Sequence, residues 1–175
     1  MNGVPLESVE FASIKQINPD LEGDHYLQLN VENTFEWINY VQNLVQSNTT
    51  DGIVVFVDCA YQFGTPEIKN SGFYAIKQKF TQSHGNSADV FDNVVIIHRD
   101  SLQDINHLLA NIFEFIPPEH CHKSLNCIVV SNVSIFYWDL RDAENFDQLA
   151  DFHTICKHQA AKLGCYVVST RSLFD

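Results

Sequence analysis

Basic residues and long apolar runs are both scarce in this sequence, and each scarcity argues against a class of function. The 175-residue chain has 10 Lys plus Arg against 22 Asp plus Glu, a formal net charge of −12. Because DNA binding depends largely on neutralising phosphates, we do not expect the chain alone to hold DNA strongly. The apolar runs, such as residues 53–57, are far too short to span a bilayer. The first residues carry no signal-peptide pattern.

Glycine, proline and cysteine are also few, with 7, 5 and 5 residues respectively. With 45% hydrophobic and 18% charged residues, the composition excludes a collagen-like, coiled-coil or disordered chain. It predicts one globular domain, residues 1–175, with a less regular segment at 1–31. The odd cysteine count and the apolar neighbours of most cysteines predict buried, unpaired thiols in a reducing compartment.

Four short runs rich in Val and Ile alternate with segments of helical periodicity. Continuous apolar runs of this length are typical of strands buried on both faces of a parallel sheet. The alternation predicts a three-layer α/β domain, with a mostly parallel sheet and helices on both faces. Strands are expected at residues 53–57, 94–97, 127–130 and 165–168, with weaker ones at 9–17 and 26–31; helices at 33–46, 66–80, 101–116 and 145–163; and a polar loop at 81–92.

Motifs for catalysis and for cofactor binding are missing. Neither phosphate-binding glycine pattern, G-x-x-x-x-G-K-[ST] or G-x-G-x-x-G, occurs, and the carboxylates beside Gly23 would repel a triphosphate. Asp58 ends a strand, where an open α/β sheet binds ligands, but capping of the following loop is the interpretation we favour. Histidines and cysteines at residues 120–122 and 153–158 match no standard metal-ligand spacing. We therefore expect no enzyme activity, no cofactor and no metal ion.

Five basic residues are candidate DNA contacts because of their positions. Lys69, Lys77 and Lys79 lie together on the expected second helix, although a solvated helix face is the more common reason for such a group. Arg141 and Arg171 follow expected strands and should emerge at the same, carboxyl edge of the sheet. In an acidic chain, such residues would contact DNA together with a more basic partner.

The run at residues 135–138 places four large apolar side chains just beyond an expected strand, more than one face can bury. Aromatic side chains are typical hot spots of protein interfaces. Phe136, Tyr137 and Trp138 are therefore candidate partner contacts, and packing over the sheet core is an equal alternative. We also expect an open sheet edge at the last strand, which a partner would have to cover.

The order of the sequence blocks resembles a known family. FVDCAYQF, VVIIH, CIVVSNVSIFYWDLRDAENF and KLGCYVVSTRS are similar to the core of the RecA and recombinase-paralogue ATPases, over residues 20–172. The phosphate loop of that family is absent, and Ser131 stands where its acidic residue should be. ATP binding and catalysis are therefore not carried over. The chain looks most like the recombinase-like subunits of the yeast Shu complex.

This resemblance implies a role in DNA repair. It implies a non-catalytic subunit in the nucleus that pairs with another recombinase paralogue and assists recombinase filament assembly in homologous recombination. Single-stranded DNA would be reached mainly through the complex. The residues leave two alternatives open, namely a degenerate nucleotide-binding hydrolase that uses Asp58 and a generic α/β protein-interaction adaptor.

Overall fold

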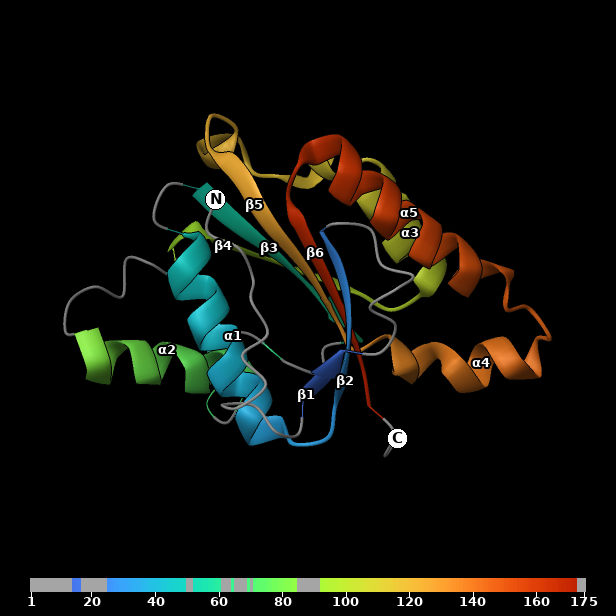
Figure 1. The fold of residues 1–175 in the computed structure, drawn as a ribbon, viewed down its shortest axis with the longest axis horizontal. Coiled ribbons are helices and arrows are strands. Elements are labelled where there is room, and N and C mark those ends of the chain that lie inside the picture. Colours follow the sequence, from blue (N-terminus) through green and yellow to red (C-terminus); the bar gives the residue numbers. More distant parts are fainter. Residues whose placement is uncertain are drawn as a thin grey trace.

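A six-stranded sheet forms the centre of the protein in a computed structural model, which describes residues 14–16, 25–49, 52–60, 64, 69, 71–84 and 92–172 (Figure 1). Its order is β1-β2-β6-β5-β3-β4. Five strands run parallel, and β1 pairs with β2 in the antiparallel direction. The strands are β1 (Ile14–Gln16), β2 (Tyr26–Val31), β3 (Gly52–Cys59), β4 (Val94–Arg99), β5 (Ser124–Ser131) and β6 (Tyr166–Arg171).

Helices cover both faces of this sheet, which confirms the expected α/β class. The chain moves from β2 to β3 and β4 in one direction, and then returns through β5 to β6. Because crossovers between parallel strands are right-handed, this reversal puts the first two helices on one face and the later ones on the other. The first pair is α1 (Thr34–Asn48) and α2 (Gly72–His84), and the second is α3 (Leu102–Ala110) and α5 (Asp147–Leu163).

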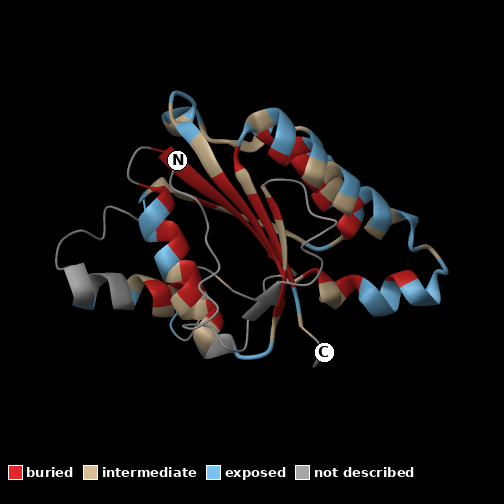
Figure 2. Cartoon of the chain, viewed as in Figure 1, coloured by how far each residue is buried: buried red, intermediate tan, exposed pale blue. Residues whose placement is uncertain are grey.

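Strand β3 is the most deeply buried element, with all eight of its residues buried. Alternate side chains face opposite ways: Val54 and Phe56 pack with α1 and α2, whereas Val55 and Val57 pack with α3 and α5. Figure 2 shows the buried strands between two helical layers whose outer faces are exposed. Among the described residues, no helix is both long and apolar enough to cross a membrane.

Local sequence signals set three helix ends as predicted. Asn33 caps α1 by accepting a 3.0 Å hydrogen bond from the Glu36 backbone amide, and Ser101 caps α3 in the same way. Gly164 ends α5 with a φ of 65°, a left-handed conformation that favours glycine. Each cap satisfies backbone groups that a helix end otherwise leaves unpaired.

Two helices differ from the prediction. Helix α2 begins at Gly72, where the Ser71 hydroxyl accepts a 3.0 Å hydrogen bond from the Tyr74 amide. Lys69 therefore lies in a turn before the helix, and residues 81–84, expected to be loop, continue it. The expected start at 65–66 and the rest of the expected loop, 85–91, lie outside the described residues.

The helix predicted at 101–116 is also interrupted. It ends at Ala110, because Asn111 leaves the helical conformation and its side-chain amide donates to the His107 carbonyl oxygen at 3.0 Å. A short 3-10 helix, η2 (Ile112–Phe115), follows. Asparagine readily forms such local side-chain bonds, which compete with helix continuation.

The prediction of an open edge at the last strand is wrong. Strand β6 pairs with β2 on one side and with β5 on the other, so its backbone groups have partners on both sides. Within the described ranges the outer strands are β1 and β4. The error arose because the sequence does not indicate which strands are neighbours. It could not show that the last strand, β6, pairs with the first long strand, β2.

Four of the five cysteines are buried, as predicted, and only Cys121 is exposed. All five thiols are free in the structure. Burial raises the pKa of the four inner thiols, to about 11 for Cys165 and higher for the others, so they stay protonated at neutral pH. These cysteines therefore act as small hydrophobic side chains.

The start of β3 generates a first test. A Cβ atom at Gly52 would meet the Ser124 carbonyl oxygen and the Asn126 side chain on the adjacent strand. We expect Gly52→Ala to lower the free energy of unfolding by about 1–3 kcal/mol through overpacking. Urea unfolding followed by circular dichroism measures this, with exposed Ser47→Ala in α1 as the control expected to change little. Equal midpoints for the two variants would contradict the tight approach of β3 to β5.

Candidate functional site

The chain turns sharply away from the sheet at the end of β5. Asn132 accepts hydrogen bonds from the Ser134 amide at 3.2 Å and from the Ser134 hydroxyl at 2.6 Å. These bonds start the 3-10 helix η4 (Val133–Phe136), which leads into α4 (Tyr137–Asp142). Phe136 and Leu140 are buried in the core between the sheet and α5. Assigning Phe136 to a partner contact is therefore wrong, because the spacing of these two residues turns both inward.

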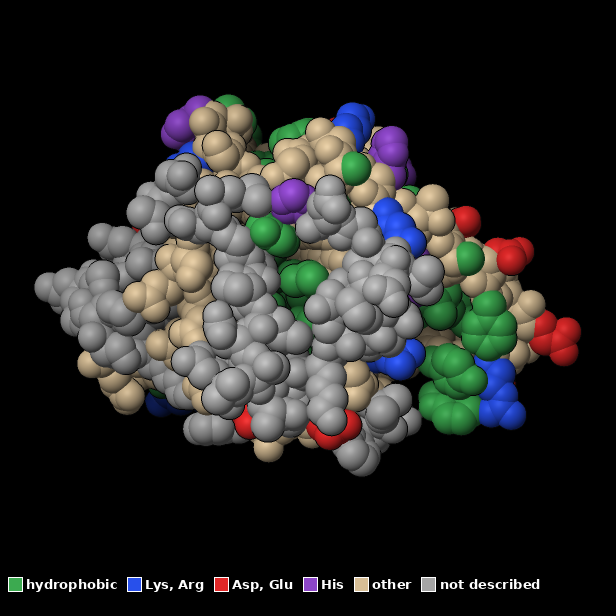
Figure 3. Space-filling view, viewed as in Figure 1, with side chains coloured by type: hydrophobic (Ala, Val, Ile, Leu, Met, Phe, Trp, Pro, Cys, Tyr) green, Lys and Arg blue, Asp and Glu red, His purple; other side chains and the backbone are tan. Residues whose placement is uncertain are grey.

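Three aromatic side chains on and after α4 remain exposed, and we call them the aromatic patch: Tyr137 (46% exposed), Trp138 (51%) and Phe146 (44%). The Tyr137 ring lies with its centroid 5.3 Å from that of Trp138 and 5.8 Å from that of Phe146. Figure 3 shows hydrophobic side chains gathered at this end of the molecule. Exposed aromatics that touch one another form a continuous apolar surface, which is typical of a binding site.

Charged residues share the segment that carries the aromatic patch. The Arg141 guanidinium lies 5.0 Å from the centroid of the Trp138 ring, within the range of a cation–π contact. Four carboxylates, the acidic rim, are exposed on α4 and in the segment after it. They belong to Asp139, Asp142, Glu144 and Asp147. The segment from Tyr137 to Asp147 therefore exposes more acidic than basic side chains.

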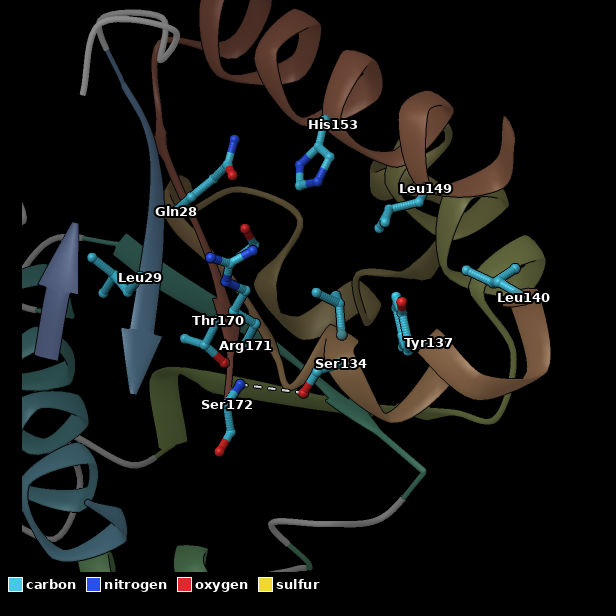
Figure 4. Close-up of a pocket in the computed structure, with 12 residues that line it drawn as sticks. Gln28, Leu29, Ser134, Tyr137, Leu140, Leu149, His153, Thr170, Arg171 and Ser172 are labelled. Carbon is cyan, nitrogen blue, oxygen red and sulfur yellow. Dashed lines mark hydrogen bonds between the residues drawn. The ribbon is translucent and has the colours of Figure 1, made fainter. Parts of the chain in front are cut away.

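A cavity of 360 Å³ lies beside the patch, at the carboxyl ends of β2, β5 and β6. Leu140 and Leu149 form part of an apolar wall, which the Tyr137 ring continues to the surface. Arg171 lines the cavity from β6 and His153 lines it from α5, as Figure 4 shows. Carboxyl ends of parallel strands are where open α/β sheets bind their ligands. A mostly apolar cavity with a few convergent polar groups is the usual form of such a site.

A buried hydrogen-bonded chain supports the inner wall. The Tyr26 hydroxyl is 2.7 Å from His153 Nδ1 and 2.9 Å from the Ser169 hydroxyl. Burial lowers the pKa of His153, and nearby Lys157 and Arg171 lower it further. The imidazole is therefore neutral at neutral pH and suited to hydrogen bonding within the wall.

Sequence reasoning missed this role of His153. His153 was considered only within a group of histidines and cysteines that matches no standard metal-ligand spacing. In the described part of the chain, no three His, Cys, Asp or Glu side chains gather to hold a metal ion. The available signal was the position of His153 four residues after Leu149, one helical turn along the same side of α5. That spacing predicts two side chains facing one cavity.

Asp58 holds the loop after β3, as we favoured. It is fully buried, and its carboxylate accepts a 2.9 Å hydrogen bond from the Gly64 amide. The same oxygen lies 3.1 Å from His98 Nδ1 on β4. This carboxylate therefore links Gly64, in the loop after β3, to the ends of β3 and β4.

The connection between β2 and α1 is unsuited to phosphate. Phosphate sites at this position use glycine-rich loops and free helix amides. Here only Glu32 and Asn33 join the strand to the helix, and the Asn33 side chain already accepts from the Glu36 amide. The exposed carboxylate of Glu32 would also repel phosphate. Gly23, the other candidate, lies outside the described residues.

The structure separates the candidate DNA contacts into two groups. Lys77 lies on α2, across the sheet from α4 and α5, and Lys69 is exposed in the turn before α2. Arg141 and Arg171 are both on the carboxyl side of β5 and β6, as predicted. The side chain of Lys79 lies outside the described part of the structure.

No protein-family model matches this chain, and a search of curated proteins finds no significant match. Its function therefore has to be proposed from the geometry of the fold and of the cavity.

The lowered pKa of His153 generates a second test. Because this histidine binds its proton less readily in the folded than in the unfolded protein, stability is full above about pH 6.5 and falls as the pH drops below that value. We expect His153→Gln to reduce this loss. Urea unfolding at pH 7.5, 6.0 and 5.0 measures it, with exposed His158→Gln on the same helix as the control. Parallel pH profiles for wild type and His153→Gln would contradict a buried, neutral imidazole.

Proposed function

We propose that the chain is a non-catalytic subunit of a recombinase-paralogue complex. It pairs with another recombinase-like protein and assists recombinase filament assembly during homologous recombination and DNA repair in the nucleus. It acts by holding partners, without turning over a nucleotide. The observation that carries the proposal is the exposed aromatic surface at the carboxyl edge of the sheet. Open α/β sheets bind their ligands at this edge.

The fold is compatible with this proposal. A parallel five-stranded sheet with helices on both faces agrees with a recombinase-like core. The two-residue connection between β2 and α1 disfavours a phosphate site. The engagement of Asp58 by the following loop likewise disfavours the alternative of a degenerate hydrolase. Both observations favour a binding role over a catalytic one.

The aromatic patch supports a protein partner. An exposed tryptophan and two exposed aromatic neighbours place considerable apolar area in water, and that area becomes favourable when a partner covers it. Tyrosine, tryptophan and arginine are the residues most enriched among interface hot spots. Tyr137, Trp138 and Arg141 occur together here.

Contact with single-stranded DNA would be shared with the partner. The net charge of −12 opposes DNA binding by the chain alone. Within a complex, Arg141 and Arg171 on the carboxyl edge, or Lys69, Lys77 and Lys79 in and near α2, would add to a basic surface of the partner. Such contacts would be weak individually and dependent on salt.

Affinity purification followed by reconstitution tests the proposed function. We expect the tagged chain to recover a recombinase-like protein from cells with damaged DNA. The purified complex should bind a fluorescent single-stranded oligonucleotide with an affinity that falls as salt rises, whereas the chain alone should not bind. Recovery of other partners only would favour a generic adaptor. Micromolar binding of ATP with magnesium, measured by calorimetry, would favour the hydrolase instead.

A substitution in the aromatic patch tests its part in the complex. We expect Trp138→Ala to weaken partner binding by about 30-fold, the effect of losing a hot spot of about 2 kcal/mol. Phe113→Ala is the matched control, because Phe113 is 63% exposed on η2, outside the patch. Titration calorimetry with the reconstituted partner measures both. If the two variants weaken binding equally, the patch is not the partner surface.

A further inference from the structure

The cavity and the aromatic patch form one continuous surface. Tyr137 belongs to both, since its ring contacts Trp138 and Phe146 outside and its side chain lines the cavity with Leu140 and Leu149. Apolar surface therefore extends from the cavity interior onto the exposed face of α4. An occupant that covers all of it must fill the cavity and also continue past its mouth. A small molecule of cavity size would leave the outer rings uncovered.

We propose that this surface binds a basic segment of a partner protein, which inserts one large apolar side chain into the cavity. A volume of 360 Å³ is ample for a leucine, phenylalanine or tryptophan side chain. The outer rings of Trp138 and Phe146 then pack against residues that flank the inserted side chain. This inference rests on the proposed function in that the segment belongs to a protein of the complex.

Charge complementarity identifies the flanking residues as basic. The four carboxylates of the acidic rim outnumber the two basic groups of the site, Arg141 beside Trp138 and Arg171 in the cavity wall. Lysine or arginine residues beside the inserted side chain would therefore be attracted to α4. The same carboxylates repel a phosphate backbone, so a nucleic acid is the less favoured occupant.

The inner wall offers hydrogen bonds to the backbone of the segment. Arg171 lies in the wall near the sheet, opposite the leucines, and its guanidinium can donate to carbonyl oxygens. Tyr26 holds the neutral His153 imidazole at the other side of the wall. Fixed polar groups in the wall favour one direction of the bound peptide backbone. The apolar cavity favours a large apolar side chain.

Peptide selection on the whole chain tests this proposal. Random 12-residue peptides on phage would be selected on the wild-type protein after removal of those that bind the Leu149→Trp variant, whose indole narrows the cavity. We expect enriched peptides to share one large apolar residue flanked by Lys or Arg. Enrichment of acidic peptides, or of none, would overturn the proposal.

Binding constants for one selected peptide then test the site itself. By fluorescence anisotropy, we expect at least tenfold weaker binding to Leu149→Trp and Trp138→Ala. Little change is expected for Leu163→Trp, a control at the far end of the same helix, or for Phe113→Ala. Replacing the apolar residue of the peptide by alanine should also cost tenfold or more. Equal losses in the controls, or displacement of the peptide by a dT12 oligonucleotide, would overturn the proposal.

Reversing the charge of the acidic rim distinguishes electrostatic attraction of the peptide from apolar packing against the rings. We expect the double variant Asp139→Lys, Asp142→Lys to weaken peptide binding at low salt and to remove its salt dependence. The matched control is the double variant Glu114→Lys, Glu119→Lys, which changes two exposed carboxylates on another surface. It should leave the affinity for the peptide and its salt dependence unchanged. Unaltered binding to the rim variant would show that the flanking residues are not held by charge.

This test is independent of the recombination test. If the peptide binds as expected but no recombinase-like partner is recovered, the site stands and the proposed complex fails. If the complex forms on single-stranded DNA and Leu149→Trp leaves it intact, the complex stands and the proposed occupant of the cavity fails.

Discussion

The pairing of β2 with β6 is the contact on which the candidate site depends. It joins the first long strand of the described chain to the last strand, with residues such as Leu29 and Thr170 side by side in parallel register. Without it, Tyr26 would not reach His153 and Ser169, and the cavity would lose one wall. Because these residues are more than a hundred positions apart in sequence, the site forms only when the whole sheet is assembled.

The carboxyl edge of the sheet carries two different kinds of chemistry. Around Asp58, a buried carboxylate is used to fix a loop and a neighbouring strand. On α4 and just after it, apolar rings face solvent and exposed carboxylates lie on the same segment. A nucleotide needs positive charge and free amide groups along this edge. The described β2–α1 connection presents the carboxylate of Glu32, and the acidic rim outnumbers Arg141 and Arg171. This charge balance favours a protein ligand over a phosphate-bearing one.

The sequence was sufficient for the fold class because its strongest patterns are local. The Val- and Ile-rich runs predicted the central strands, and Asn33, Ser101 and Gly164 marked helix ends through interactions within a few residues. The neighbours of β6 could not be predicted this way, since strand order depends on contacts between distant segments. The same limit applies to the cavity, which combines side chains from β2, β6, η4, α4 and α5.

The aromatic run shows how far a local pattern can be taken. Its composition predicted more apolar area than one face can bury, and this was correct for Tyr137 and Trp138. The pattern could not assign Phe136 to the core, because that depends on the turn that Asn132 imposes after β5. Helical geometry then decides the outcome: once η4 and α4 are placed, Phe136 and Leu140 face the sheet and Trp138 must face outward. The turn at Asn132 therefore divides the apolar run between the core, which takes Phe136, and the surface, which takes Tyr137 and Trp138. Packing of the core in this way also fixes the position of the aromatic patch that a partner would recognise.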